Sequence, residues 1–441
     1  MTNDATPQPF LRRFGLGCAT AALATLLGCS SDETSGPTGP ELPKEKRGRY
    51  TIVWLEGTPY EMGYQHGQAL REELVAGVEA VQRNVLLRLM FDLALEEGIL
   101  QIALDNSYPE IIEECQGMVD GAQLDGWTMT ECILLSSADI TAEFATEGVP
   151  DAEDITPGCL NVVATGSATS DGGLYHARML DWAKIDYVVE HPTIFVRRPA
   201  TGIPHVTISF PGNIGPYQGM NAAGLVVASN ETPVRDNTVH DRTGESHVQM
   251  VARLLATAES VDDARALVTA ANHMTVEQFA VSDAASGQGE VYEMTPAAVG
   301  VRTMTDDVVF HTNHFVAPET AELDAEPPGE SSPLRWQRLE QLILPDGVDS
   351  LHGSLSPEVL VTVLRDRIHP VTKEESGIQW FDNNESIATN GALYAVVFDG
   401  AGQRFWLAAG AIPVPPQPFT GFSLAELLGE ADASAIPPTI P

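Results

Sequence analysis

Cys159 is the residue with the clearest potential for chemistry in this chain. It follows Gly158 directly, in the sequence PGCLNVVATG. If the peptide bond between these two residues is cut, Cys159 gains a free α-amino group, whose ordinary pKa is about 8. Such an amine can act as general base to the thiol of its own residue, so one residue supplies both nucleophile and base. A buried cysteine on a strand is otherwise a core residue, and that alternative stays open here.

Two charged residues follow Cys159 at a spacing that favours a hairpin. Residues 159–181 read as a strand, a turn at TSDGG and a second strand, which ends in Arg178 and Asp181. The hairpin would place both side chains beside Cys159. A guanidinium near the sulfur favours the thiolate, and a carboxylate can hold the ammonium or the thiol in position. From the spacing alone, a surface ion pair at a strand end is the alternative.

The first residues predict export and a lipid anchor. Arg12 and Arg13 precede an apolar run that is too short to span a bilayer and ends in LLGC. We therefore expect a lipoprotein signal peptide over residues 1–28 and acylation of Cys29, which anchors the protein in a membrane by its acyl chains. An ordinary signal peptide is the alternative. The predicted location is the periplasm or the outer membrane or surface of a bacterium.

The charge and the cysteine count limit the remaining possibilities. The net charge of −37 argues against nucleic acid and against attraction to anionic lipid. In an oxidising compartment, Cys115, Cys132 and Cys159 form either one disulfide and a free thiol or three free thiols. If Cys115 pairs with Cys132, Cys159 is the cysteine left over.

The chain divides into a disordered tether (29–48), a mostly helical region (49–158) and a region rich in strands (159–441), which the family resemblance described below would make a pro-region and a catalytic domain. The helical region opens its first helix with the capping box TPYE at Thr58–Glu61. Blocks of strands and helices after it favour an α+β architecture over a doubly wound sheet. The expected strands are 159–167, 174–181, 192–198, 204–210, 224–230, 279–283, 289–294, 307–312, 393–399 and 403–409, and the expected helices are 245–257, 260–272, 333–343 and 357–367.

The stretch PGCLNVVATGSATSDGGLYHARMLDW resembles the acyl-coenzyme A:6-aminopenicillanic acid acyltransferase-like family, whose members are autoproteolytic N-terminal-nucleophile enzymes. A more distant similarity is to bile salt hydrolases, penicillin V acylases and acid ceramidases. The blocks GTPYEMGYQHGQALREEL, GMNAAGLVVASN, FHTNHF, SSPLRWQRLEQLI and YAVVFDGAGQRFWLAAG carry the resemblance over most of the chain after the tether. It implies a four-layer αββα sandwich, cleavage between Gly158 and Cys159, and two fragments that stay packed together.

The resemblance also implies roles for individual residues. Cys159 is the expected nucleophile, and Arg178 and Asp181 orient and stabilise it. Asn313 matches the asparagine expected near the oxyanion, where an amide N–H stabilises charge on the acyl oxygen. Asn230 is the expected second oxyanion group, although its strand is one residue out of register with the bile salt hydrolases. Arg335 aligns with a distal arginine, for which Arg338 competes; turn or strand-end capping is the alternative for the two asparagines.

These observations predict a self-processing amidohydrolase or acyltransferase. The expected substrate is a small amide with a hydrophobic acyl group, cleaved at its carbon–nitrogen bond through a thioester on Cys159, with hydrolysis preferred to acyl transfer. No cofactor is expected, and no metal, because His311 and His314 lie on a strand and its following loop and need not converge. A lipid-anchored binding protein that keeps the fold without processing, and an esterase or phospholipase-like hydrolase, are the alternatives.

Overall fold

The computed structural model describes residues 44–146, 158–182, 184–234, 239–324, 330–377, 385–389, 391–430 and 435–441. These residues belong to one compact unit. The predictions for the signal peptide, for Cys29 and for most of the acidic loop before Gly158 lie outside the described residues. Among the residues described, no helix is long and apolar enough to cross a membrane.

The larger of the two sheets has nine strands, of which two precede Gly158 in the chain and seven follow it. All neighbouring strands in it are antiparallel except β2 and β5, which pair in parallel from Thr51↔Thr193 to Gly57↔Pro199. In order across the sheet the strands are β1 (Lys44–Arg47), β2 (Tyr50–Gly57), β5 (Thr193–Pro199), β6 (His205–Ser209), β7 (Gln218–Asn221), β8 (Leu225–Glu231), β9 (Glu277–Asp283), β10 (Gln288–Met294) and β11 (Val299–Thr303).

The smaller sheet has six strands, and Cys159 directly precedes one of them. Its central strands are buried on both faces along most of their length. In order the strands are β12 (Val308–His311), β3 (Leu160–Gly166), β4 (Gly172–Asp181), β13 (Ala392–Asp399), β14 (Arg404–Ala409) and β15 (Thr420–Ser423).

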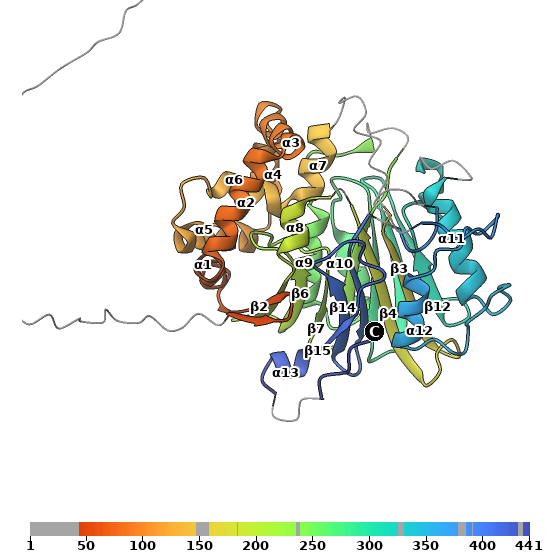
Figure 1. Ribbon diagram of the computed structural model, residues 1–441. Helices are drawn as coiled ribbons and strands as arrows, with labels where there is room; N and C mark the ends of the chain where they lie inside the picture. The colour runs from red at the N-terminus through yellow and green to blue at the C-terminus, as the bar shows by residue number, and fades with distance from the viewer. Residues whose placement is uncertain are drawn as a thin grey trace, which may run out of the picture. The chain divides into compact units, whose positions relative to one another are not determined.

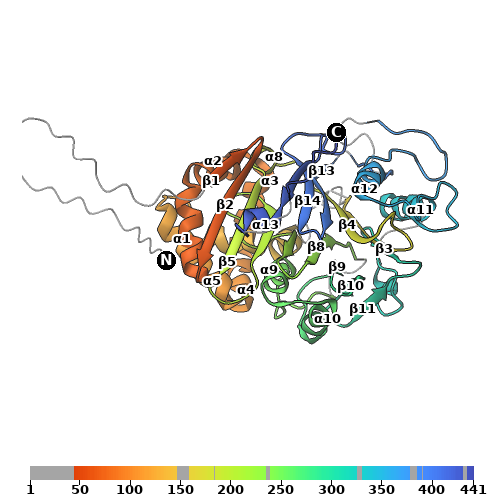
Figure 2. The same ribbon diagram turned by 90° about the horizontal axis from the view of Figure 1, so that it is seen from below.

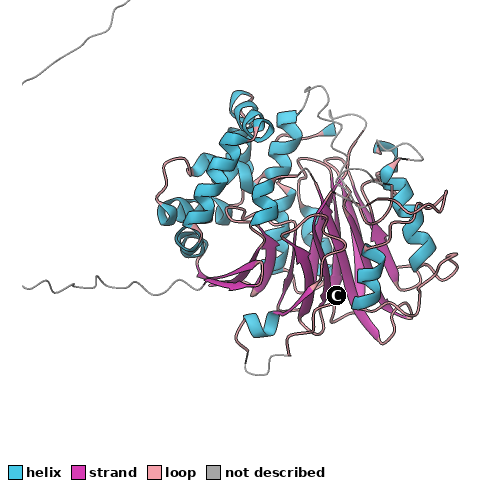
Figure 3. Cartoon of the chain, in the orientation of Figure 1, coloured by secondary structure: helices cyan, strands magenta, loops and turns pink. Residues whose placement is uncertain are grey.

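Helices cover the outer faces of both sheets (Figures 1 and 3). Apolar residues of α11 and α12 pack on the smaller sheet, and those of α9 and α10 pack on β8, β9 and β10. A third cluster fills the space between the sheets, where Ile194 and Val226 of the large sheet meet Val396 and Leu407 of the small one. The layers are therefore αββα, as predicted. The helices are α1 (Pro59–Ala69), α2 (Arg71–Arg83), α3 (Val85–Glu96), α4 (Ile99–Asn106), α5 (Pro109–Ala122), α6 (Met129–Ser136), α7 (Ala138–Thr146), α8 (Asp186–Glu190), α9 (His247–Thr257), α10 (Val261–Ala270), α11 (Ser331–Ile343), α12 (Pro357–Leu364) and α13 (Leu424–Leu427), with a 3-10 helix, η3 (Ala321–Leu323).

The N-terminal region is helical but also supplies two strands of the large sheet. Thr58 and Glu61 form the predicted capping box at the start of α1. Before it, the sequence YTIVWLEG forms β2, whose side chains point alternately to the two faces of the sheet, with Ile52 in the space between the sheets and Val53 towards α1. The prediction of a disordered tether up to residue 48 is wrong for its last residues, because Lys44–Arg47 pairs with β2 as strand β1 (Figure 2).

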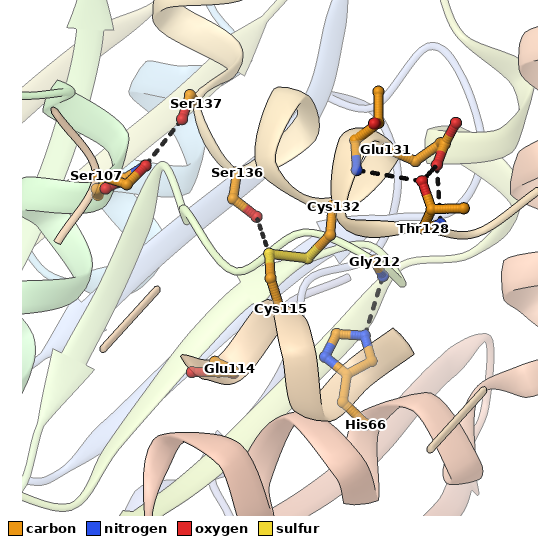
Figure 4. Close-up of a disulfide and its surroundings, with 12 residues drawn as sticks. His66, Ser107, Glu114, Cys115, Thr128, Glu131, Cys132, Ser136, Ser137 and Gly212 are labelled. Atoms are coloured by element: carbon orange, nitrogen blue, oxygen red, sulfur yellow. Dashed lines mark hydrogen bonds between the residues drawn. A yellow bond between two sulfur atoms is a disulfide. The ribbon is translucent and has the colours of Figure 1, made fainter. Parts of the chain in front are cut away.

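A disulfide joins Cys115 of α5 to Cys132 of α6 (Figure 4). The two Cα atoms are 5.6 Å apart, within the range that a disulfide allows. Of the two arrangements that the sequence left open, one disulfide with a free thiol is therefore the one observed, and the buried free cysteine is Cys159. Both bonded cysteines precede Gly158, so this disulfide does not connect the two sides of the predicted cleavage point.

Candidate active site

The β3–β4 hairpin brings Cys159 next to Asp181, because Leu160 pairs with Met179 and Asn161 with Arg178. The sulfur of Cys159 lies 3.4 Å from both the backbone oxygen and the backbone nitrogen of Asp181. It donates its proton to the oxygen and accepts one from the N–H. This geometry fixes the thiol at the end of the hairpin, directly after the bond that joins it to Gly158.

The guanidinium of Arg178 is completely buried beside this thiol. Its Nη2 donates to the carbonyl oxygen of Ser229 at 2.5 Å, whereas Nε and Nη1 make no hydrogen bond with any residue that the structure describes. Burial raises the pKa of Cys159 to about 11, and the charge of Arg178 opposes that rise. In the uncut chain the sulfur is therefore a thiol at neutral pH, held next to a cation that would stabilise the thiolate.

The carboxylate of Asp181 fills a space that two glycines leave open. A Cβ atom on Gly158 would lie 2.2 Å from Oδ2, and one on Gly391 would lie 1.9 Å from Oδ1, so neither position accepts a side chain without moving the carboxylate. Only 3 % of Asp181 is exposed, and this burial raises its pKa to about 7 despite the charge of Arg335. The carboxyl group therefore changes its charge near neutral pH, in contact with Gly158.

Asp181→Asn is expected to change how the stability of the protein depends on pH. The native pKa of Asp181 lies above the ordinary value of 3.8, so between about pH 4 and pH 7 the folded chain binds more protons than the unfolded chain. Its contribution to the free energy of unfolding consequently falls as the pH rises, by roughly 4 kcal/mol in total for a shift of about three units. In uncut Cys159→Ala protein, asparagine should therefore stabilise at pH 8 and have little effect at pH 4, as measured by urea unfolding.

The exposed Asp346 is the control for this prediction, because Asp346→Asn also removes one carboxylate. Equal unfolding curves of the Asp346→Asn protein and its parent at both pH values are expected. A stabilisation by Asp181→Asn that is the same at pH 4 and pH 8 would contradict a raised pKa of Asp181.

Arg335 of α11 connects the bond before Cys159 to Asn313. Its Nη1 donates to the carbonyl oxygens of Gly158 and Cys159 at 3.2 and 2.8 Å, and its Nη2 donates to Oδ1 of Asn313 at 2.9 Å. The side chain is completely buried. Arg338, the competing residue one turn away, instead pairs with Asp366 and Asp349.

Asn313 and Asn230 lie in different surroundings. Asn313 accepts from Arg335 and donates through Nδ2 to the backbone oxygen of Glu231 at 2.7 Å. Asn230 accepts from Nδ2 of Asn161 at 2.9 Å and donates to the backbone oxygen of Thr312 at 3.2 Å. Its amide is thus occupied by a buried network that continues through Asn161 to His176 and His311. The structure does not place Asn230 against Cys159.

A pocket opens at Cys159. Most of its exposed wall is apolar, and a second cavity shares Trp182, Val188, Phe210 and Tyr217 with it. The second cavity extends between the helices α2, α3 and α6, which all precede Gly158. The N-terminal region therefore lines part of the space that leads to the sulfur.

Glu231 and Glu277 also line the pocket, together with Tyr217, and none of the three was predicted as a site residue. Glu231 directly follows Asn230, so the one-residue difference in register at this strand could have pointed to Glu231. The pairing of Glu231 with Glu277 depends on the neighbouring strands β8 and β9, which are separated by two helices in the chain.

The two facing sheets and the helical outer layers define a four-layer αββα sandwich, and Cys159 directly precedes β3 in its smaller sheet. Residues 181–411 match the model of the acyl-coenzyme A:6-aminopenicillanic acid acyl-transferase family, and the chain belongs to this family. The match begins at Asp181 and contains Asn230, Asn313 and Arg335, whereas Cys159 precedes it.

Individual relatives are distant. An uncharacterized protein of Archaeoglobus fulgidus is 25% identical over an alignment of 403 residues, which covers 83% of this chain and 65% of that relative. An N-acylethanolamine-hydrolyzing acid amidase ortholog of Caenorhabditis elegans is 14% identical with a TM-score of 0.40, covering 55% of this chain and 93% of that chain. A conjugated bile acid hydrolase of Clostridium perfringens is 14% identical with a TM-score of 0.38, covering 60% and 93%.

Proposed function

We propose that this protein is a self-processing amidohydrolase that uses Cys159 as its N-terminal nucleophile. The contacts of Arg335 are the observation that carries the proposal. In the uncut chain one nitrogen of this buried cation donates to the carbonyl oxygen of Gly158, which belongs to the bond that would be cut. A cation in this position stabilises the negative charge that develops on that oxygen when the carbonyl carbon is attacked.

Self-cleavage would proceed by attack of the Cys159 sulfur on the carbonyl carbon of Gly158. The thiol proton passes to the departing nitrogen, the carbon–nitrogen bond breaks and a thioester forms between Gly158 and the sulfur. Water then hydrolyses the thioester, which leaves a carboxylate on Gly158 and a free thiol on Cys159. The new α-amino group of Cys159 can accept the thiol proton in later turnovers, as the mechanism of a single-residue nucleophile and base requires.

The same groups would then cleave a substrate amide. The sulfur attacks the amide carbonyl, the amine leaves with a proton, and water resolves the acyl thioester; an amine in place of water would give acyl transfer. The pocket at Cys159 would receive the substrate, and release of the new chain end at Gly158 would open the sulfur to it. Arg178 is already placed to stabilise the thiolate, which burial otherwise disfavours.

The apolar pocket supports a substrate amide whose acyl group is hydrophobic. The wall near the sulfur contains Leu180, Phe210 and Leu393, and the adjoining cavity between α2, α3 and α6 extends this apolar surface. Burial of apolar area contributes about 25 cal/mol per Å², so a cavity of this kind favours a substantial alkyl or aromatic group. Because α2, α3 and α6 line the cavity, both fragments would be needed for binding.

Export as a lipoprotein is part of the same proposal. The apolar run before LLGC and the Cys29 that ends it support this proposal, and the Cys115–Cys132 disulfide is typical of an oxidising compartment outside the cytosol. Anchoring would be through acyl chains on Cys29.

The test is the intact mass of purified wild-type protein that begins after Cys29, followed by assay of matched amides and esters with the same acyl group. Two fragments, the larger beginning at Cys159, and faster cleavage of the amide are expected. A folded chain that stays in one piece would favour a binding protein, and cleavage of the ester alone would favour an esterase.

A further inference from the structure

Two glutamates face each other directly at the wall of the Cys159 pocket. Glu231 is the last residue of β8 and Glu277 is the first residue of β9, and the two are paired in the antiparallel register of these strands. The Cβ atoms of directly opposite residues lie about 4.5–5.5 Å apart, on the same face of the sheet. Like charges in this arrangement destabilise a sheet, so the pair needs an explanation.

Glu277 is the more unusual of the two. Only 5 % of it is exposed, and its side chain makes no hydrogen bond or ion pair with the residues that the structure describes. Burial, and then the negative charge of Glu231, raises its pKa. A buried carboxylate without a donor costs free energy, and native structures normally provide it with a partner.

A third carboxylate nearby, that of Asp139, has the hydrogen-bond donors that Glu277 lacks. Asp139 also lines the pocket, but it accepts from the hydroxyl of Ser246 at 2.7 Å and from the backbone N–H of His247 at 2.6 Å, at the N-terminus of α9. The protein thus satisfies Asp139 internally, whereas no side chain or backbone group of the described residues donates a hydrogen bond to the carboxylate of Glu277. The positive charge of Arg178 acts on Glu277 and opposes the rise of its pKa, but the Nη2 of Arg178 bonds to the carbonyl oxygen of Ser229 and no ion pair joins the two side chains.

We propose that Glu231 and Glu277 bind a positively charged group, a primary ammonium or a guanidinium, on the amine half of the substrate. This inference rests on the proposed amidase function. It concerns the amine half of the substrate, whereas the apolar cavity accounts for the acyl half. The acyl group occupies the apolar wall that continues between α2, α3 and α6. The cationic amine half then lies along the wall with the paired carboxylates, where an ammonium supplies the hydrogen bonds that Glu277 lacks.

Binding of two uncleavable ethers to the processed full chain tests this proposal. One carries a dodecyl group on one side of the oxygen and a 5-aminopentyl group on the other, and the second has a hexyl group in place of the aminopentyl group. We expect the charged ether to bind at least about tenfold more tightly by calorimetry at low salt. The preference should fall close to one in Glu277→Gln protein.

The matched control is Glu259→Gln, which removes one negative charge from an exposed position outside the pocket and should keep the preference. Glutamine has nearly the same shape as glutamate and relieves repulsion at residue 277, so Glu277→Gln is expected to fold; its thermal midpoint verifies this. Equal binding of the two ethers by wild type, or a preference that persists in Glu277→Gln, would overturn the proposal.

Hydrolysis of the two corresponding amides separates this inference from the proposed function. A preference for the charged ether without cleavage of either amide would support the cation-binding site and contradict the amidase function. Cleavage of both amides at equal rates, with equal binding of the two ethers, would support the amidase function and contradict the cation-binding site.

Discussion

Cys159→Ala protein is expected to remain a single chain and to cleave no amide. The substitution removes the only atom at this position that can attack the Gly158 carbonyl carbon, so the rate of self-cleavage should fall at least about a thousandfold. The methyl group of alanine occupies less space in a buried site, which leaves the fold in place. Intact mass after several days at neutral pH measures the outcome.

Cys159→Ser provides the comparison for this prediction. A hydroxyl is a weaker nucleophile than a thiol but has nearly the same shape, so slow production of the same two fragments is expected. Cleavage between residues 158 and 159 in the alanine variant would contradict the mechanism, because another group or a contaminating protease would then cut the chain.

Arg335→Lys is expected to slow self-cleavage by about 10²–10³-fold. Removal of one donor to a developing oxyanion has effects of this size. A lysine ammonium cannot replace a planar guanidinium that donates to two backbone oxygens and to Asn313 at once. The buried acceptors left without a donor should also lower the free energy of unfolding, by about 1–3 kcal/mol each. The rate of fragment appearance on denaturing gels measures the first effect.

Arg338→Lys is the matched control, since Arg338 is also buried on α11 but bonds to Asp349 and Asp366 instead of to the Gly158 carbonyl oxygen. We expect this variant to lose stability and to be cut at the wild-type rate. Equal slowing of cleavage by both substitutions would show that the effect of Arg335→Lys comes from general loss of stability. The pair also distinguishes the two arginines that the sequence left in competition.

Most strands of the catalytic region could be predicted from the sequence because they are apolar and bounded by turn residues. The expected strand over 174–181 is Gly172–Asp181 in the structure, and the expected strand over 393–399 is Ala392–Asp399. Shorter strands such as β7 and β15, with four residues each, carry too little pattern to be recognised. The strand β2 was not predicted, because Ile52, Val53 and Leu55 are buried on both faces and its sequence is a short apolar run without the alternation that marks a half-buried strand.

The site could be predicted only where local sequence determines it. A single hairpin joins Cys159, Arg178 and Asp181, so spacing and turn chemistry suffice to bring them together. Arg335 lies on a helix far along the chain, and only the family resemblance suggested it. The pairing of Glu231 with Glu277 requires the register of two strands separated by α9 and α10, which no local pattern encodes.

The parallel pairing of β2 with β5 gives the proposed cleavage a thermodynamic consequence. Before cleavage, β2 and β5 belong to one chain, and refolding is a unimolecular reaction whose equilibrium does not depend on protein concentration. After cleavage they belong to two molecules, and no disulfide of the described residues joins them. The stability of the cut protein then depends on concentration, as for a dimer. A cut molecule that unfolds in dilute solution would therefore have little chance of refolding, so its working lifetime would be set by its unfolding rate.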